Sequence, residues 1–155
     1  MMKTPVKSVM SRKLITLPTG SSLSQAEDLM SEKRIRHLPI INKNSEVIGM
    51  LCDHHLVTRG DPYSIPVDYV MNRDFECLHQ DLPLRNSVLK MLEKKISAVL
   101  ICNDEKEAVG IVTTDDLLWQ LASLLEHEKD HITLASIFNI NTINRAADQI
   151  SNAGI

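Results

Sequence analysis

The sequence predicts a mixed α/β (α+β) fold made of two β-α-β-β-α repeats. Shifted by 61 positions, the chain matches itself without a gap, with 16 identical residues over positions 5–56. Each copy shows the same succession of a short extended segment, a helical pattern, two apolar strands and a second helix. The 155 residues are 43% apolar, which allows one core shared by two small halves.

In each copy a short extended segment precedes the first helix. These segments are expected over Leu14–Leu17 and Phe75–Leu78. In copy one, Ser22 and Gln25 have the spacing of a capping box, and apolar residues recur at helical spacing after them. In copy two, Pro83 suits the first helical turn. The stripe expected to be buried on this second helix is Leu84, Val88, Met91 and Leu92.

Two short apolar strands and a further helix complete each copy. The strands are expected at Leu38–Ile41, Val47–Leu51, Ala98–Cys102 and Val109–Val112. Polar turns at Asn42–Glu46 and Asn103–Glu107 join them in pairs. A helix is then expected to begin near Asp53 and near Thr114, the latter running through Leu117, Leu118, Leu121, Leu124 and Leu125. One copy alone exposes too much apolar surface, so the copies should pack together as one body.

The repeat divides the chain into three parts. Copy one is assigned residues 1–60, copy two residues 61–126 and a C-terminal extension residues 127–155. A glycine and two prolines make Arg59–Pro66 the linker, because they break both helix and strand. A last helix is expected over Thr142–Ser151, with no counterpart in copy one.

Composition restricts the classes of partner and compartment. The net charge of -3 gives no general attraction to nucleic acid or to an anionic membrane. No apolar run approaches the length of a membrane span, and the N-terminus lacks the apolar region of a secretory signal. Cys52, Cys77 and Cys102 have no C-x-x-C spacing, which suggests reduced thiols. We therefore expect a cytoplasmic protein that binds neither nucleic acid nor membrane.

The stretch Gly110–Leu117 (GIVTTDDL) carries the chemistry of copy two. An apolar strand leads directly into two threonines and two aspartates at the start of a helix. Thr113 or Thr114 could cap this helix, with the aspartates favouring its dipole. A hydroxyl and free N–H groups at a helix start can also hold a phosphate. The residues alone leave capping and ligand binding open.

Three motifs occurring in order resemble a tandem pair of cystathionine-beta-synthase (CBS) domains over roughly residues 5–126. They are Val9-Met10-Ser11, Arg36-His37-Leu38-Pro39-Ile40 and Gly110–Leu117. The resemblance implies one body with pseudo-two-fold symmetry and two clefts between the copies. Such clefts commonly bind adenine nucleotides, nucleosides or S-adenosylmethionine. Pairs of this kind often dimerise, and most regulate another protein rather than catalyse a reaction.

The resemblance also assigns residues to the first cleft. It places Asp116 at the ribose, where one carboxylate can accept hydrogen bonds from two adjacent hydroxyls, and Thr113 at the phosphate. Arg36 is either a second phosphate ligand or a solvated arginine at a strand end. The full expected set is Thr16, Leu17, Pro18, Ile35, Arg36, His37, Ile96, Ser97, Ile111, Thr113 and Asp116.

The second cleft is expected to be degenerate. Cys52 stands where copy two has Thr113, and His55 stands where it has Asp116, with Cys77 as a further member of this set. A thiol is a poor phosphate donor, and a neutral imidazole cannot accept two ribose hydrogen bonds. Cys52 and His55 would share a helix face as two metal ligands, but His37 or His79 would have to join them. Adjacent histidines cannot readily chelate one ion, so no metal site is predicted.

The sequence thus predicts a regulatory module that senses an adenine nucleotide (AMP, ADP or ATP) or S-adenosylmethionine and transmits it to an unidentified regulated protein. No cofactor is obligatory, and no catalytic residue is assigned, because no Ser-His-Asp ordering, Walker loop or H-E-x-x-H motif occurs. A homodimer is expected through the helical segments 28–34 or 117–125. The alternative is a structural dimerisation module with degenerate clefts.

Overall fold

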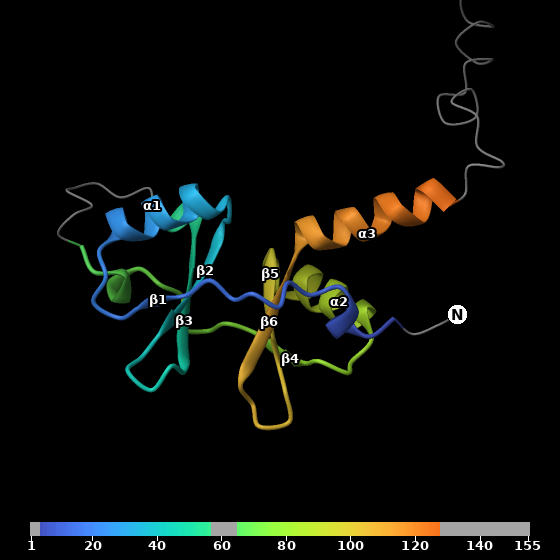
Figure 1. The fold of residues 1–155 in the computed structure, drawn as a ribbon, viewed down its shortest axis with the longest axis horizontal. Coiled ribbons are helices and arrows are strands. Elements are labelled where there is room, and N and C mark those ends of the chain that lie inside the picture. Colours follow the sequence, from blue (N-terminus) through green and yellow to red (C-terminus); the bar gives the residue numbers. More distant parts are fainter. Residues whose placement is uncertain (1–3, 57–64, 128–155) are drawn as a thin grey trace, which may run out of the picture. The chain divides into compact units, whose positions relative to one another are not determined.

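The computed structural model describes residues 4–56 and 65–127 and contains two three-stranded sheets of the same topology (Figure 1). The strands are β1 (Leu17–Pro18), β2 (His37–Ile41), β3 (Val47–Cys52), β4 (Cys77–His79), β5 (Ala98–Cys102) and β6 (Ala108–Thr113). In each sheet the first strand pairs parallel with the second, and the second pairs antiparallel with the third. This confirms the predicted mixed α/β fold with duplicated units.

The first helix of each repeat packs against its own sheet. α1 (Leu23–Lys33) contacts β2, and α2 (Leu84–Lys94) contacts β5. The capping box of α1 is confirmed: the main-chain N–H of Gln25 donates to Ser22 Oγ, and that of Ser22 donates to Gln25 Oε1, at 3.2 and 2.9 Å. Both helices end on a residue in the left-handed conformation.

Two expectations for α2 were wrong. Pro83 is the N-cap and not a residue of the first turn, since the helix begins at Leu84. Leu92 is 71% exposed, whereas Ser87 and Met91 are the buried residues of this helix. Successive residues of a helix lie about 100° apart around its axis, so Leu92 turns away from the sheet that Met91 contacts.

The first strand of each repeat lies later in the chain than expected. The sequence places it over 14–17 and 75–78, but pairing begins only at Leu17, opposite Ile40, and at Cys77, opposite Leu100. The residue pattern indicates extended backbone, but it does not show at which residue hydrogen bonding to a neighbouring strand begins. The predicted helix start near Thr114 is confirmed by α3 (Thr114–His127).

The other expected helices fall partly or wholly outside the described residues. Near Asp53 the chain forms a short 3₁₀ turn over Asp53–Leu56, and any continuation lies beyond the described range. Most of the linker Arg59–Pro66 and the whole predicted helix Thr142–Ser151 also lie outside it.

The opening segment of the chain completes the core of the second repeat. Val6 and Met10 pack with Val99, Ile101 and Val112 of β5 and β6. Val6 N–H donates to the Leu82 carbonyl at 2.8 Å, and Ser11 exchanges two main-chain hydrogen bonds with Ile111. The N-terminal segment therefore belongs structurally to the half that follows it in sequence.

The opening segment of the second repeat does the same for the first. Val67 and Met71 pack in a core with residues of α1, β2 and β3, among them Leu38 and Leu51. Asn72 exchanges two main-chain hydrogen bonds with Met50, each 2.8 Å long. Each contact passes a glycine of β3 or β6, since a Cβ at position 49 or 110 would overlap the thioether of Met71 or Met10. The two halves thus exchange hydrophobic segments.

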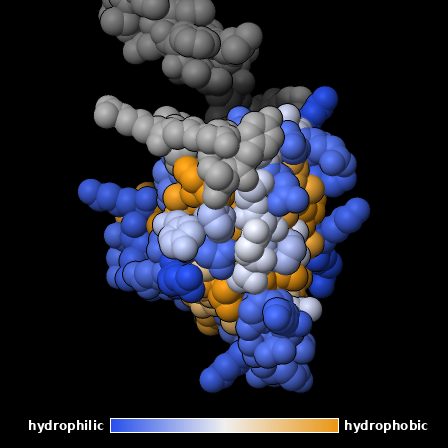
Figure 2. Space-filling view, turned by 90° about the vertical axis from the view of Figure 1, so that its left-hand side faces the viewer, coloured by the Kyte–Doolittle hydropathy of each residue, from blue (hydrophilic) through white to orange (hydrophobic). Residues whose placement is uncertain are grey.

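The described surface is mostly hydrophilic on the face beside α1, with apolar side chains between the polar ones (Figure 2). On α3 by itself, several large apolar side chains are at least half exposed, namely Leu118, Trp119, Leu121, Leu124 and Leu125. In the part of the chain that the structure describes, no helix is both long enough and apolar enough to cross a bilayer.

The segment exchange predicts that stability depends on residues outside the strands and long helices. Val6→Ala and Val67→Ala should each lower the free energy of unfolding by about 2 kcal/mol, because each removes buried methyl groups and leaves a cavity. Urea unfolding followed by circular dichroism measures this loss. Val9→Ala, in the same segment but only partly buried, is the matched control and should cost less than half as much. If Val6→Ala and Val67→Ala lowered the free energy of unfolding no more than Val9→Ala does, the exchanged segments would not be a source of stability.

Candidate functional site

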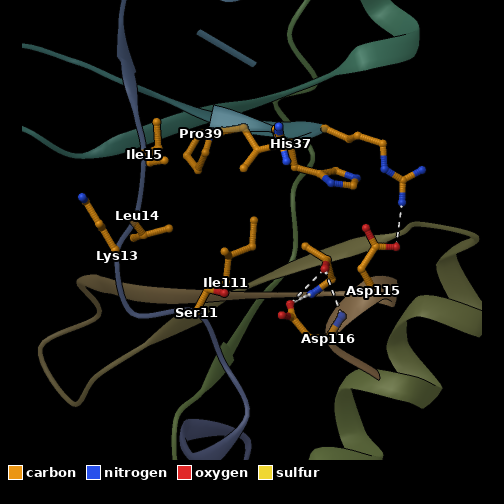
Figure 3. A pocket seen from close by; sticks show the side chains of 13 residues that line it. Ser11, Lys13, Leu14, Ile15, His37, Pro39, Ile111, Asp115 and Asp116 are labelled. Carbon is orange, nitrogen blue, oxygen red and sulfur yellow. Dashed lines mark hydrogen bonds and ion pairs between the residues drawn. The ribbon is translucent and has the colours of Figure 1, made fainter. Parts of the chain in front are cut away.

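A cavity of about 350 Å³ lies between the two repeats. Figure 3 shows Leu14 and Ile15 entering it from the N-terminal segment, Pro39 and His37 from β2, and Asp115 and Asp116 from the start of α3. Lys13 lies at the rim of the cavity, with its amine pointing away from the middle. The lining residues are Ser11, Lys13, Leu14, Ile15, Arg34, Ile35, Arg36, His37, Pro39, Ile111, Thr113, Asp115 and Asp116. We call this cavity the first cleft. Its walls come from both halves because the exchanged segment crosses between them.

The start of α3 forms a reciprocal cap that uses part of the Asp116 carboxylate. Thr113 donates to Asp116 Oδ2 from its main-chain N–H at 2.7 Å and from its hydroxyl at 2.9 Å. The main-chain N–H of Asp116 donates in return to Thr113 Oγ1 at 3.4 Å. Within the described residues, Asp116 Oδ1 has no hydrogen-bond donor. Capping therefore occurs, and it leaves one carboxylate oxygen available on the wall of the cleft.

Arg36 and Asp115 connect the two repeats across the first cleft. An Arg36 guanidinium nitrogen lies 3.0 Å from Asp115 Oδ1, and both side chains are more than half exposed. A pair this exposed contributes little to stability, because water and salt screen it. It therefore remains open to competition from another charged group.

The structure brings together only part of the residue set that the sequence assigned to this cleft. Ile35, Arg36, His37, Ile111, Thr113 and Asp116 line it. Thr16, Leu17 and Pro18 do not; Lys13, Leu14 and Ile15 take that place. By Leu17 the chain has entered β1 and is buried in the core opposite Ile40, so the cleft-lining residues come earlier.

Ile96 and Ser97 line the other cavity, not the first cleft. They are the residues that the 61-position shift matches to Ile35 and Arg36, so pseudo-symmetry places them at the equivalent wall. The repeat alignment contained this signal, because each lining residue of one cleft should have its counterpart in the other. Sequence reasoning also missed Ser11, Lys13, Leu14, Ile15, Arg34, Pro39 and Asp115.

The second cleft is a cavity of about 310 Å³ related to the first by the repeat. Cys52, His54 and His55 occupy the positions of Thr113, Asp115 and Asp116. Cys77, which the sequence grouped with them, is not among the lining residues. Its position in β4 explains this, because the chain reaches the cleft only with the residues before it, Asp74, Phe75 and Glu76.

The cap is kept in the second cleft although its chemistry differs. The main-chain N–H of Cys52 donates to His55 Nδ1 at 3.1 Å, as that of Thr113 does to Asp116. Burial, reinforced by Asp53, raises the pKa of the Cys52 thiol to about 11. Burial, reinforced by His54, lowers the pKa of His55. Both side chains are therefore uncharged at neutral pH, and the carboxylate of the first cleft has no counterpart here.

His37 lies on the wall shared by the two clefts. It lines both cavities, is only 8% exposed, and its Nε2 lies 2.7 Å from the hydroxyl of Ser97 in the other repeat. Burial, followed by the neighbouring Arg36 charge, lowers the pKa of its imidazole. The ring is therefore neutral at pH 7 and joins the halves by a hydrogen bond between uncharged groups.

The formal charge of the two clefts is opposite. Lys13, Arg34 and Arg36 outnumber the two aspartates that line the first cleft, for a sum of +1. In the second cleft one lysine, Lys95, and two carboxylates, Asp74 and Glu76, line the wall, for a formal sum of -1 when histidines are not counted. Glu76 also pairs with Lys94 at 3.3 Å. The first cleft therefore favours an anionic ligand more than the second does.

Comparison with known proteins agrees with this architecture. A model of the CBS domain matches residues 6–60 and again residues 67–123. The solved CBS domain pair of protein MJ0100, in complex with 5′-methylthioadenosine and S-adenosyl-L-methionine, is 25% identical with a TM-score of 0.72; the match covers 79% of this chain and 98% of that one. An uncharacterized conserved protein from Pyrococcus horikoshii is 32% identical with a TM-score of 0.69, covering 87% and 99%.

A relative of established activity is much longer than this chain. L-aspartate semialdehyde sulfurtransferase of Methanocaldococcus jannaschii is 28% identical over 119 residues, which are 75% of this chain but 23% of that protein. The chain therefore spans about a quarter of the length of this relative.

The burial of His37 predicts a pH dependence of stability. Its folded-state pKa lies below the ordinary value of 6.5, so the unfolded chain binds the proton first as the pH falls. Stability from this residue is complete above about pH 6.5 and is lost as the pH falls through the folded-state pKa. The free energy of unfolding, measured with urea, should fall less between about pH 7.5 and about pH 5 for His37→Gln than for the unaltered protein.

His79→Gln is the matched control, because it replaces an imidazole whose Nε2 faces the exposed carboxylate of Asp104. In this variant the free energy of unfolding should differ between the two pH values by more than it does in His37→Gln. A loss of stability at low pH that His37→Gln leaves unchanged would show that this imidazole does not cause it.

Proposed function

The chain belongs to the CBS domain family, of which it carries two copies, and we propose that its first cleft binds an adenine nucleotide or an adenosyl compound as a regulatory signal. The observation that carries this proposal is the Asp116 carboxylate on the wall of a cavity built by both repeats, one oxygen of which has no donor among residues 4–56 and 65–127. The cavity, of about 350 Å³, lies within the range of small-molecule sites. The complex of the related MJ0100 pair with two adenosyl compounds supports the same class of ligand.

Each part of such a ligand has a matching wall in the first cleft. Ile15, Ile35, Pro39 and Ile111 supply apolar surface for a flat base. The carboxylate of Asp116 can accept hydrogen bonds from two neighbouring ribose hydroxyls. Next to it, Arg36, which pairs with Asp115, supplies positive charge that suits phosphate, and Lys13 and Arg34 are the other cations that line the cavity.

Binding would act through the relation between the two repeats. The ligand touches residues of both halves, and a phosphate would compete with Asp115 for Arg36. A ligand shifts a protein between two arrangements only by its different affinity for them. We propose that a separate regulated protein detects the resulting arrangement, and that the module itself performs no catalysis.

The alternative function is structural dimerisation with clefts that no longer bind ligand. The loss of the threonine and aspartate at Cys52 and His55 favours it for the second cleft. The exposed apolar side chains of α3 support a homodimer under either function. Saturable ligand binding at the first cleft separates the two.

The ribose contact is tested by Asp116→Asn. The amide keeps an oxygen to accept the Thr113 N–H, so the helix cap survives, but it removes the charge and one of the two acceptors. Titration calorimetry with AMP, ADP, ATP, S-adenosylmethionine and 5′-methylthioadenosine should show one adenosyl ligand whose affinity falls about tenfold or more. His55→Ala, at the equivalent position of the second cleft, should leave this affinity unchanged. Absence of binding to all five at millimolar ligand would favour the structural module.

The phosphate contact is tested by Arg36→Gln. If the guanidinium holds phosphate, affinity for a phosphate-bearing ligand should fall about tenfold while that for 5′-methylthioadenosine, which has no phosphate, stays the same. Lys43→Gln, an exposed cation in the β2–β3 turn, is the control for loss of one surface charge. Equal losses for ligands with and without phosphate would mean that Arg36 only shapes the cleft.

A further inference from the structure

The second cleft gathers three metal-ligating side chains at the end of β3. We propose that Cys52, His54 and His55 bind a divalent transition-metal ion of the zinc class there. Their candidate ligand atoms, one sulfur and two imidazole nitrogens, all lie within 4.8 Å of one another. Ligands of one tetrahedral zinc ion lie about 3.5 Å apart, so small side-chain rotations close the set around an ion. This site goes beyond the proposed adenosyl ligand and does not depend on it.

The local backbone explains how two adjacent histidines join one cysteine. On a regular helix, neighbouring side chains diverge by about 100°. Here β3 ends at Cys52 and the chain tightens into the 3₁₀ turn Asp53–Leu56. The His54 and His55 rings then lie 4.3 Å apart between centroids, tilted by 60°. The turn therefore provides the third ligand that the sequence pattern alone did not place.

Neighbouring groups can orient the two imidazoles. Asp53 Oδ1 accepts the main-chain N–H of His54 at 2.8 Å and lies 3.8 Å from His54 Nδ1. A rotation of the ring would bring this carboxylate behind the imidazole, and a carboxylate behind a ligand histidine is a common support. His54 is 70% exposed and free to turn. His55 Nδ1 accepts the Cys52 main-chain N–H, so ligation by this ring replaces one hydrogen bond.

The cleft leaves room for a further ligand. Three protein ligands around zinc leave one tetrahedral position open, and the cavity of about 310 Å³ beside them admits water or a small molecule. Asp74 and Glu76 also line it. His37 is held by Ser97, and His79 is not among the lining residues, so neither completes the set.

The donor set indicates the class of ion. Cys52 is a thiol at neutral pH, so binding would displace its proton to solvent and ligate the ion through the thiolate. A thiolate and two imidazoles favour zinc, cobalt, nickel or copper, whereas magnesium and calcium prefer oxygen ligands. A divalent ion adds two positive charges and its thiolate ligand adds one negative charge, so occupancy would change the formal sum of the second cleft from -1 to 0. It would thereby give the two clefts different ligands within one pseudo-symmetric body.

The test is a titration of the full chain, kept reduced and free of nucleotide, with Co²⁺ and then with competing Zn²⁺. Co²⁺ bound through a cysteine shows a thiolate-to-metal charge-transfer absorption and tetrahedral d–d bands. We expect one equivalent to bind with both signals, and Zn²⁺ to displace it. Cys52→Ser should abolish the charge-transfer band, and His54→Ala and His55→Ala should each weaken affinity about tenfold or more. Cys77→Ser, a thiol outside the cleft, should change nothing.

Two outcomes would overturn the proposal. One is the absence of a Co²⁺ spectrum at millimolar metal. The other is binding that survives Cys52→Ser with its charge-transfer band intact, which would assign the site to another thiol. Circular dichroism of each variant confirms that it is folded, and Asp116→Asn, which alters only the first cleft, should bind Co²⁺ normally. Failure of adenosyl binding would leave these results unaffected.

Discussion

The exchange of opening segments between the two halves is the constraint on which the remaining structure depends. A three-stranded sheet with one helix leaves much of its apolar face uncovered. Val6 and Met10 close the core over β5 and β6, and Val67 and Met71 close the core over the first sheet. Because each half supplies buried residues to the other, the hydrophobic effect stabilises the pair more than either repeat alone.

The same exchange builds the two clefts. The N-terminal segment leaves the core of the second repeat at Met10 and then lines the first cleft with residues between Ser11 and Ile15. In the same way, the chain leaves the core of the first repeat at Met71 and lines the second cleft with residues between Asn72 and Glu76. Each cleft therefore has walls from both halves, joined by the Arg36–Asp115 pair and the His37–Ser97 hydrogen bond. A ligand in either cleft would contact both halves, which is the physical requirement for the proposed sensing function.

Duplication kept the backbone and changed the chemistry. β6 ends at Thr113, whose main-chain N–H donates to Asp116, and β3 ends at Cys52, whose main-chain N–H donates to His55. Both strands therefore end in the same cap. In one copy the acceptor is the Asp116 carboxylate, which uses one oxygen for the cap. In the other copy it is an imidazole beside a thiol and a second imidazole. The fold thus accepts different side chains at this position, because the cap needs a hydrogen-bond acceptor and not one particular residue.

Features that rest on local or periodic interactions could be predicted from the amino-acid sequence. The 61-residue repeat, the Ser22–Gln25 capping box, the polar turns and the start of α3 all follow from short spacings. Tertiary structure alone decided which segments complete which core, because that depends on contacts between distant residues. It replaced Thr16–Pro18 by Lys13–Ile15 at the first cleft, moved Ile96 and Ser97 to the second, and turned Leu92 to solvent. It also brought His54 to Cys52 and His55, since the 3₁₀ turn over Asp53–Leu56 could not be told from an α-helix by its residues alone.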